Sequence, residues 1–147
     1  MKLSCSQKNL GAGLAIVGRV VATTTTLPIT KNVLLTTDQS RLRLSATNRE
    51  IAISTWIDTI VEEEGSITVP GRLLSEFVAS LPSERIDIVM TPGTSVLQLT
   101  CGHFQTRING TDAEEFPPIL KVEEGMIAKL DSQTLKTAIS QVVFVAA

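Results

Sequence analysis

The residues of this chain whose types could do chemistry are few and scattered. The single histidine, His103, falls in a predicted strand with no second histidine to share a metal ion, so a structural or surface role is favoured. Cys5 and Cys101 form no Cys-x-x-Cys pair and indicate neither a zinc site nor a disulfide framework. Three consecutive carboxylates at 62–64 could hold a cation but are more typical of a solvated connection. No catalytic residue and no metal site is predicted.

Motifs for nucleotide or acyl chemistry are also absent from the sequence. Gly11 and Gly13 lie inside a helical pattern, whereas a dinucleotide fingerprint needs a strand, a turn and the start of a helix. There is no Gly-x-Ser-x-Gly elbow and no phosphate-binding loop. An enzyme is therefore disfavoured, and no cofactor is expected.

The net charge of −2 hides a division along the chain. Residues 1–37 contain four Lys or Arg and no acid, which makes this segment +4 and leaves −6 for the other 110 residues. An acid-free first helix could present a basic face to a polyanion while the rest of the surface repels it. The alternative is that these four charges are merely solvated.

The basic residues fall on predicted helices that are poor in acid. Lys8 and Arg19 belong to the first helical segment, Arg72 to the second, and Lys136 begins a third. Such sparse charges suit loose, sequence-independent contact with phosphates rather than tight binding. The chain has no Tyr, and its one Trp, Trp56, lies in an alternating strand, so base stacking is not predicted.

Hydrophobic periodicity predicts the elements that position these residues. A strand at 2–6 precedes a helix that ends near Val20, with an apolar stripe at spacings of four, three and four: Leu10, Leu14, Val17 and Val21. Close helix packing is the commoner explanation for the small residues beside this stripe. Four threonines at 23–26 then form a loop that Pro28 keeps from being helical.

The remaining pattern repeats this arrangement. Alternation predicts strands at 33–37, 41–47 and 50–59, then a strand at 66–69, a helix between Pro70 and Pro82, and strands at 86–91, 95–100 and 103–109. Strand, helix and three strands thus occur twice. The sequence predicts an α+β fold of two βαβββ motifs, with helices on one face of antiparallel sheets.

The end of the chain resembles its beginning. At an offset of 125, without a gap, six apolar residues of the first 22 positions fall on apolar residues of the last 22: Met1 on Met126, Leu10 on Leu135, Leu14 on Ile139, Val17 on Val142, Val20 on Val145 and Ala22 on Ala147. A strand at 127–131 and an amphipathic helix after it are therefore expected. We expect one domain at 1–122 and the truncated start of a second, similar domain at 123–147.

Composition is that of an ordinary soluble globular protein, with 43% hydrophobic and 19% charged residues. No window approaches the roughly 18 to 20 apolar residues of a membrane span. The N-terminus lacks the apolar core of a signal peptide. A cytoplasmic location is expected.

Several segments resemble the N-terminal domain of the bacterial DNA polymerase III β subunit, the sliding clamp. They are the opening Met-Lys-Leu strand with its helix, 26–35 (TLPITKNVLL), 46–51 (ATNREI), 69–72 (VPGR), 81–82 (LP) and 112–117 (DAEEFP). The resemblance spans essentially the whole chain, in order. It implies the DNA clamp fold, with three such domains per subunit and two subunits in a ring around double-stranded DNA. Helices would line the hole, sheets would form the outer wall, and the ring would act as a processivity factor without catalysis.

The resemblance also suggests which residues face DNA. Arg19 and the loop at 23–26, with Thr24 and Thr25 at its centre, are the first candidates, and Lys8 and Arg72 are further ones. Clamps often carry a basic residue in this loop. Because the loop here is all threonine, its contact with DNA is expected to be weaker.

The last strand, 103–109, resembles the edge that pairs with the third domain of the neighbouring subunit in a homodimeric ring. Phe104, Thr106 and Ile108 are therefore subunit-interface candidates. An aromatic residue is common near Thr106, whereas Phe104 lies two positions earlier.

Partners of the whole ring are implied only indirectly. The groove for the DNA polymerase III catalytic subunit and the clamp loader lies in later domains of the family, so these partners are expected to bind outside this chain. The alternative function is a non-catalytic tandem α+β protein-interaction module whose basic helices are incidental.

Overall fold

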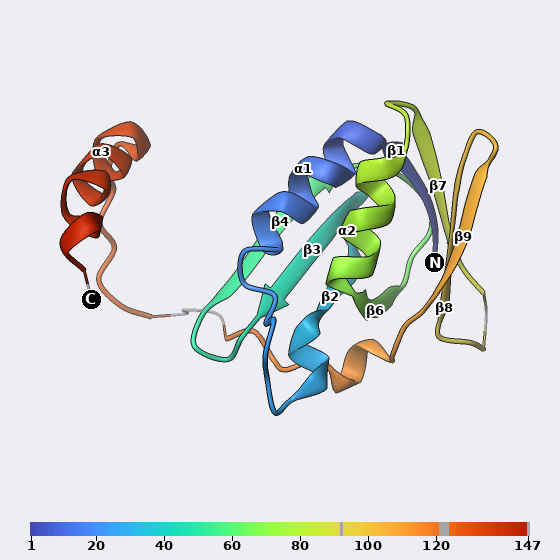
Figure 1. Cartoon of the computed structure of the whole chain (residues 1–147), viewed down its shortest axis with the longest axis horizontal. Helices are drawn as coiled ribbons and strands as arrows, with labels where there is room; N and C mark the ends of the chain where they lie inside the picture. Colours follow the sequence, from blue (N-terminus) through green and yellow to red (C-terminus); the bar gives the residue numbers. More distant parts are fainter. Residues whose placement is uncertain (92, 121–123, 147) are drawn as a thin grey trace.

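The computed structural model describes residues 1–91, 93–120 and 124–146. Figure 1 shows a body of helices and twisted sheets, followed by a separate C-terminal helix, α3. Its elements in chain order are β1 (Lys2–Ser6), α1 (Gln7–Val17), η1 (Pro28–Lys31), β2 (Asn32–Asp38), β3 (Arg41–Thr47), β4 (Ala52–Asp58), β5 (Ile60–Glu63), β6 (Ser66–Pro70), α2 (Gly71–Ser80), β7 (Arg85–Met90), β8 (Val96–Cys101), β9 (Phe104–Asn109), η2 (Ala113–Glu115), α3 (Ser132–Val142) and η3 (Val143–Val145).

The strands form two antiparallel sheets in which the two motifs exchange their first strands. The sheet orders are β5-β1-β7-β8-β9 and β4-β3-β2-β6. β1 opens the first motif but pairs with β7 of the second, whereas β6 opens the second motif and pairs with β2 of the first. The predicted α+β fold with antiparallel sheets is confirmed, and the exchange ties the two motifs into one body.

One strand was not predicted. Instead of a single strand at 50–59, β4 ends at Asp58 and β5 follows, pairing with the outer edge of β1. The solvated connection expected at 62–64 is therefore wrong in part, since Glu62 and Glu63 belong to an edge strand. Both side chains are exposed, and Glu62 forms an ion pair with Lys2. Charged side chains of this kind are typical of sheet edges.

Helix α1 is capped and oriented as its sequence predicts. The Ser6 hydroxyl accepts a hydrogen bond from the Asn9 amide at 3.1 Å, which satisfies one free N–H of the first turn. The stripe of Leu10, Leu14 and Val17 is buried. The helix ends at Val17 rather than near Val20, since Gly18, a poor helix former, begins a turn.

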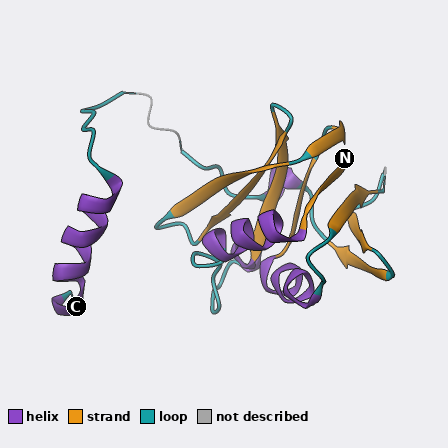
Figure 2. Cartoon of the chain, turned by 90° about the horizontal axis from the view of Figure 1, so that it is seen from above, coloured by secondary structure: helices purple, strands orange, loops and turns teal. Residues whose placement is uncertain are grey.

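Helices α1 and α2 lie side by side on one side of the strands (Figure 2). α1 contacts β3 and β4, while α2 contacts β2 and β6. At Gly13 the backbone of α1 approaches the sheet so closely that a Cβ atom would lie 2.7 Å from Leu44 Cδ1 and 3.0 Å from Ile57 Cγ2. Close packing therefore accounts for this glycine, which lies outside the row of small residues, Gly11, Ala15, Gly18 and Ala22, for which the sequence suggested it.

The C-terminal segment forms its helix but not its strand. Asp131 caps α3 through Oδ2, which accepts from the Thr134 amide at 2.8 Å. The strand predicted at 127–131 is wrong: these residues have no regular secondary structure and pair with no strand of the described residues, and a strand needs a neighbouring edge to hydrogen-bond. The apolar residues Leu135, Ile139 and Val142 are 44–60% exposed. The expected boundary between 122 and 123 lies outside the described residues.

Within the described part of the chain, no helix is both long and apolar enough to cross a membrane.

Candidate nucleic-acid interface

A groove of about 620 Å³ lies between the end of α1 and the start of α2. Its lining comes from α1, the turn after it, η1 and the first turns of α2: Leu14, Ala15, Gly18, Arg19, Val21, Ala22, Thr23, Lys31, Gly71, Arg72, Ser75 and Glu76. Three exposed cations meet there, each from a different element. Arg19 and Arg72 were expected to face DNA, and the fold brings them together with Lys31, to which no role was assigned from sequence.

Arg72 is not a free cation. Its Nε donates to Glu76 Oε1 at 2.7 Å, one helical turn further along α2. This hydrogen bond, with the charge of Glu76, raises the pKa of Arg72. A phosphate approaching Arg72 would therefore compete with Glu76, whereas Arg19 and Lys31 form no ion pair with any carboxylate of the described residues.

The threonine loop is a loop, as predicted, but its central residues differ in availability. Thr24 is exposed. Thr25 is half-buried, and its Oγ1 accepts from the Leu27 amide at 3.0 Å and lies 3.1 Å from Thr30 Oγ1. Thr25 thus orders the loop itself and has little hydroxyl capacity left for a ligand.

Lys8 lies apart from this groove. It is exposed in the first turn of α1, while the groove lies beyond the other end of the same helix. Any phosphate it meets must be a different one from that at Arg19.

Among the strands of the described residues, β8 is the only neighbour of β9, the predicted subunit edge, in its sheet. Phe104 is 53% exposed and Thr106 half-buried. Ile108 is only 2% exposed because it faces the core opposite Leu97 on β8. Its side chain is therefore used within the domain while its backbone lies at the edge, and a place for Ile108 in a subunit interface stays a prediction.

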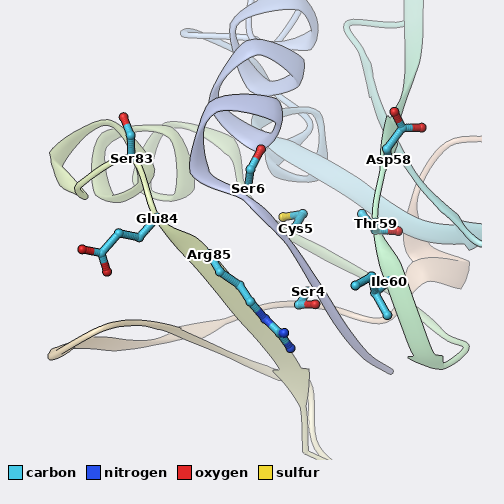
Figure 3. A pocket seen from close by; sticks show the side chains of 9 residues that line it. All are labelled: Ser4, Cys5, Ser6, Asp58, Thr59, Ile60, Ser83, Glu84 and Arg85. Carbon is cyan, nitrogen blue, oxygen red and sulfur yellow. The ribbon is translucent and has the colours of Figure 1, made fainter.

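A second cavity of about 510 Å³ lies where β1 meets the β4–β5 corner and the start of β7 (Figure 3). Cys5 lies in its centre, while Glu84 and Arg85 point away from the thiol (Figure 3). Arg85 is held by Asp87, with Nε and Oδ1 2.9 Å apart. Because the polar groups do not converge, this cavity has no catalytic arrangement.

We expect Cys5 to be inert in the folded protein. Burial, with a smaller contribution from Asp87, raises the pKa of this thiol to about 12, so the reactive thiolate is scarce at pH 8. Labelling by iodoacetamide, followed by mass spectrometry, should be at least about a hundredfold slower than in urea. The folded state favours the neutral thiol. The contribution of buried, neutral Cys5 to the free energy of unfolding is therefore present below pH 9 and falls as the pH rises toward 12. Rapid native labelling of Cys5 would contradict its burial.

Residues suited to metal binding are dispersed. His103 occupies the turn between β8 and β9 rather than a strand, and it is exposed. Among the described residues, no group of three or more His, Cys, Asp or Glu side chains is placed to hold a metal ion.

Two exchanged βαβββ motifs, with paired helices that carry sparse cations, define the class of DNA clamp domains. Residues 1–121 match the family model of the DNA polymerase III beta subunit, N-terminal domain, and the chain belongs to this family.

Individual relatives agree with this assignment. The beta sliding clamp of Synechococcus elongatus is 33% identical over 137 residues, covering 92% of this chain and 36% of the relative. The DNA polymerase sliding clamp structure from Bacillus subtilis is 25% identical with a TM-score of 0.92, covering 98% of this chain and 40% of that one. The DNA polymerase III subunit beta structure from Pseudomonas aeruginosa is 27% identical with a TM-score of 0.86, covering 95% and 38%. The chain thus spans less than half the length of these relatives.

Proposed function

We propose that this chain forms the first module of a sliding clamp, a ring that encircles duplex DNA and keeps the replicative polymerase on it. The observation that carries the proposal is the meeting of Arg19, Lys31 and Arg72 in the groove between α1 and α2. These cations lie on the helical side of the module, and the charges are few. A ring retains DNA by enclosing it, so weak phosphate contacts are sufficient and allow sliding.

The wider assembly is part of the same proposal. A domain boundary near residue 122 would make α3 the first helix of a second module, in the place that α1 holds in the first. The β9 edge, with Phe104 and Thr106, would pair with the third domain of a neighbouring subunit in a homodimeric ring. The module has no chemical step of its own, acts in the cytoplasm, and leaves polymerase and clamp-loader binding to later domains.

The DNA-facing surface can be tested by titrating the 147-residue chain with a duplex of about 20 base pairs at about 50 mM salt. The measurement is the change in amide chemical shifts. Shifts should concentrate at the end of α1, the following turn and the start of α2. Arg19→Glu should weaken binding about tenfold or more, because it removes one phosphate contact and adds repulsion.

Arg41→Glu is the matched control. Arg41 is exposed on β3, and alternation with the buried Leu42 places it on the sheet face opposite the helices. If duplex shifts appeared on that face instead, or if both reversals weakened binding equally, the proposed DNA-facing surface would be wrong. A protein-interaction module, the alternative, would show no DNA-dependent shifts at all.

A further inference from the structure

Lys31 lines the same groove as Arg19 although 12 positions separate them in the sequence. It is the last residue of η1, is exposed, and lines the groove together with Thr23. Neither Lys31 nor Arg19 forms an ion pair with a described carboxylate, while Arg72 is bonded to Glu76. The two cations available to a ligand in this groove are therefore Lys31 and Arg19.

Hydrogen bonds hold Lys31 in this position. Its neighbour Thr30 is 1% exposed, and the Thr30 hydroxyl donates to the Leu27 carbonyl at 2.8 Å. The Thr30 carbonyl accepts from the Ala22 amide at 3.1 Å, which ties η1 to the turn after α1. On the other side, a Cβ atom on Gly71 would lie 3.4 Å from the Lys31 carbonyl oxygen, so η1 is also packed against the start of α2.

We propose that Lys31 and Arg19 bind one phosphate of the duplex backbone between them, with Lys31 as a contact equal in weight to Arg19. This inference rests on the proposed function. The two cations and the Thr23 hydroxyl of the same groove provide positive charge and hydrogen-bond donors, which suit the phosphate oxygens that every nucleotide shares. Such a site is independent of sequence, as movement along DNA requires.

The test compares duplex affinity of the wild-type chain with that of Lys31→Gln, over a series of salt concentrations. Lys31→Gln should weaken binding about 3- to 10-fold and reduce the slope of log affinity against log salt by about 0.9, the value for one released counterion. Lys31→Arg should retain both the wild-type affinity and the wild-type salt slope. Lys129→Gln is the control, since Lys129 is exposed outside the groove and outside any ion pair of the described residues.

The outcomes separate this inference from the function on which it rests. If the wild-type chain binds duplex and Arg19→Glu weakens it, but Lys31→Gln behaves like Lys129→Gln, the role of Lys31 is refuted and the proposed function stands. If the wild-type chain shows no duplex binding, both fall. A free anion such as inorganic phosphate could occupy the same groove through the same charges. Saturable shifts of Lys31 with inorganic phosphate, at an ionic strength where duplex causes none, would overturn the duplex assignment.

Discussion

Leu44→Ala is expected to lower the free energy of unfolding by about 3–4 kcal/mol. Leu44 is completely buried in β3, lies between Leu35 and Thr55 of the adjacent strands, and packs under α1 at Gly13. Truncation removes three buried carbon atoms, one methine and two methyl groups, and leaves a cavity between the sheet and α1. Because domains of this size are stable by only about 5–15 kcal/mol, urea unfolding followed by circular dichroism should show a large shift of the midpoint.

Gly13 provides a second variant for the same contact. Gly13→Ala alone should cost about 1–3 kcal/mol, since its methyl group would lie 2.7 Å from Leu44 Cδ1. In Gly13→Ala with Leu44→Ala, that methyl group partly fills the cavity, so the double variant should lose less stability than the two losses added.

Gly11→Ala is the control on the same helix. The nearest atoms to a Cβ at Gly11 are 3.9 Å away, so the higher helix propensity of alanine should stabilise the chain by about 0.5–1 kcal/mol. Equal effects of alanine at Gly11 and Gly13 would contradict the close approach of α1 to the sheet.

Gly110→Ala should lower the free energy of unfolding by about 2–3 kcal/mol. Gly110 follows β9 where the chain passes β6, and a Cβ atom there would overlap the Thr68 carbonyl oxygen and lie 2.9 Å from Ile67 Cδ1. A carbonyl in a strand cannot move as a flexible side chain can. The backbone must separate, which weakens the two hydrogen bonds between Thr68 and Thr111, at 3.0 and 2.8 Å.

Hydrogen exchange localises this effect. The amide protons of Thr68 and Thr111 should exchange faster in Gly110→Ala than in wild type, while those of β3 should change only with global stability. Two results together would contradict the close approach of Gly110 to β6. These are an unfolding free energy within about 0.5 kcal/mol of wild type and unchanged hydrogen exchange at the Thr68 amide.

Much of the fold could be predicted because its signals are local. The stripe of α1 and the alternation of β3, with Leu42 and Leu44 inward and Arg41 outward, are set by residues a few positions apart. The strand β5 could not be predicted in this way. Its two glutamates, followed by Glu64 and Gly65, resemble a connection, and it becomes a strand because the edge of β1 lies beside it.

The candidate site shows the same division. Arg19 and Arg72 were identified from charge, helix position and family resemblance. Lys31 was not singled out from the sequence because nothing in the local pattern of η1 points to the groove, whereas the hydrogen bond from Ala22 to Thr30 ties η1 to the turn after α1 and places Lys31 there. Side-chain contacts also decided what Thr25 and Ile108 can offer a ligand or partner: the Thr25 hydroxyl is used within its own loop, and the Ile108 side chain is used in the core.

The sequence by itself determined the helices, most strands and the face that each buries, because these depend on side-chain periodicity within one element. Through shared motifs it also determined the family. Only the tertiary structure decided that β1 and β6 exchange sheets and that three cations from separate elements share one groove. The physical reason is that a strand's hydrogen-bonding groups are the same at every residue. Which strand pairs with which is therefore decided by the packing of the whole core. The same packing decides where each charged residue lies on the surface.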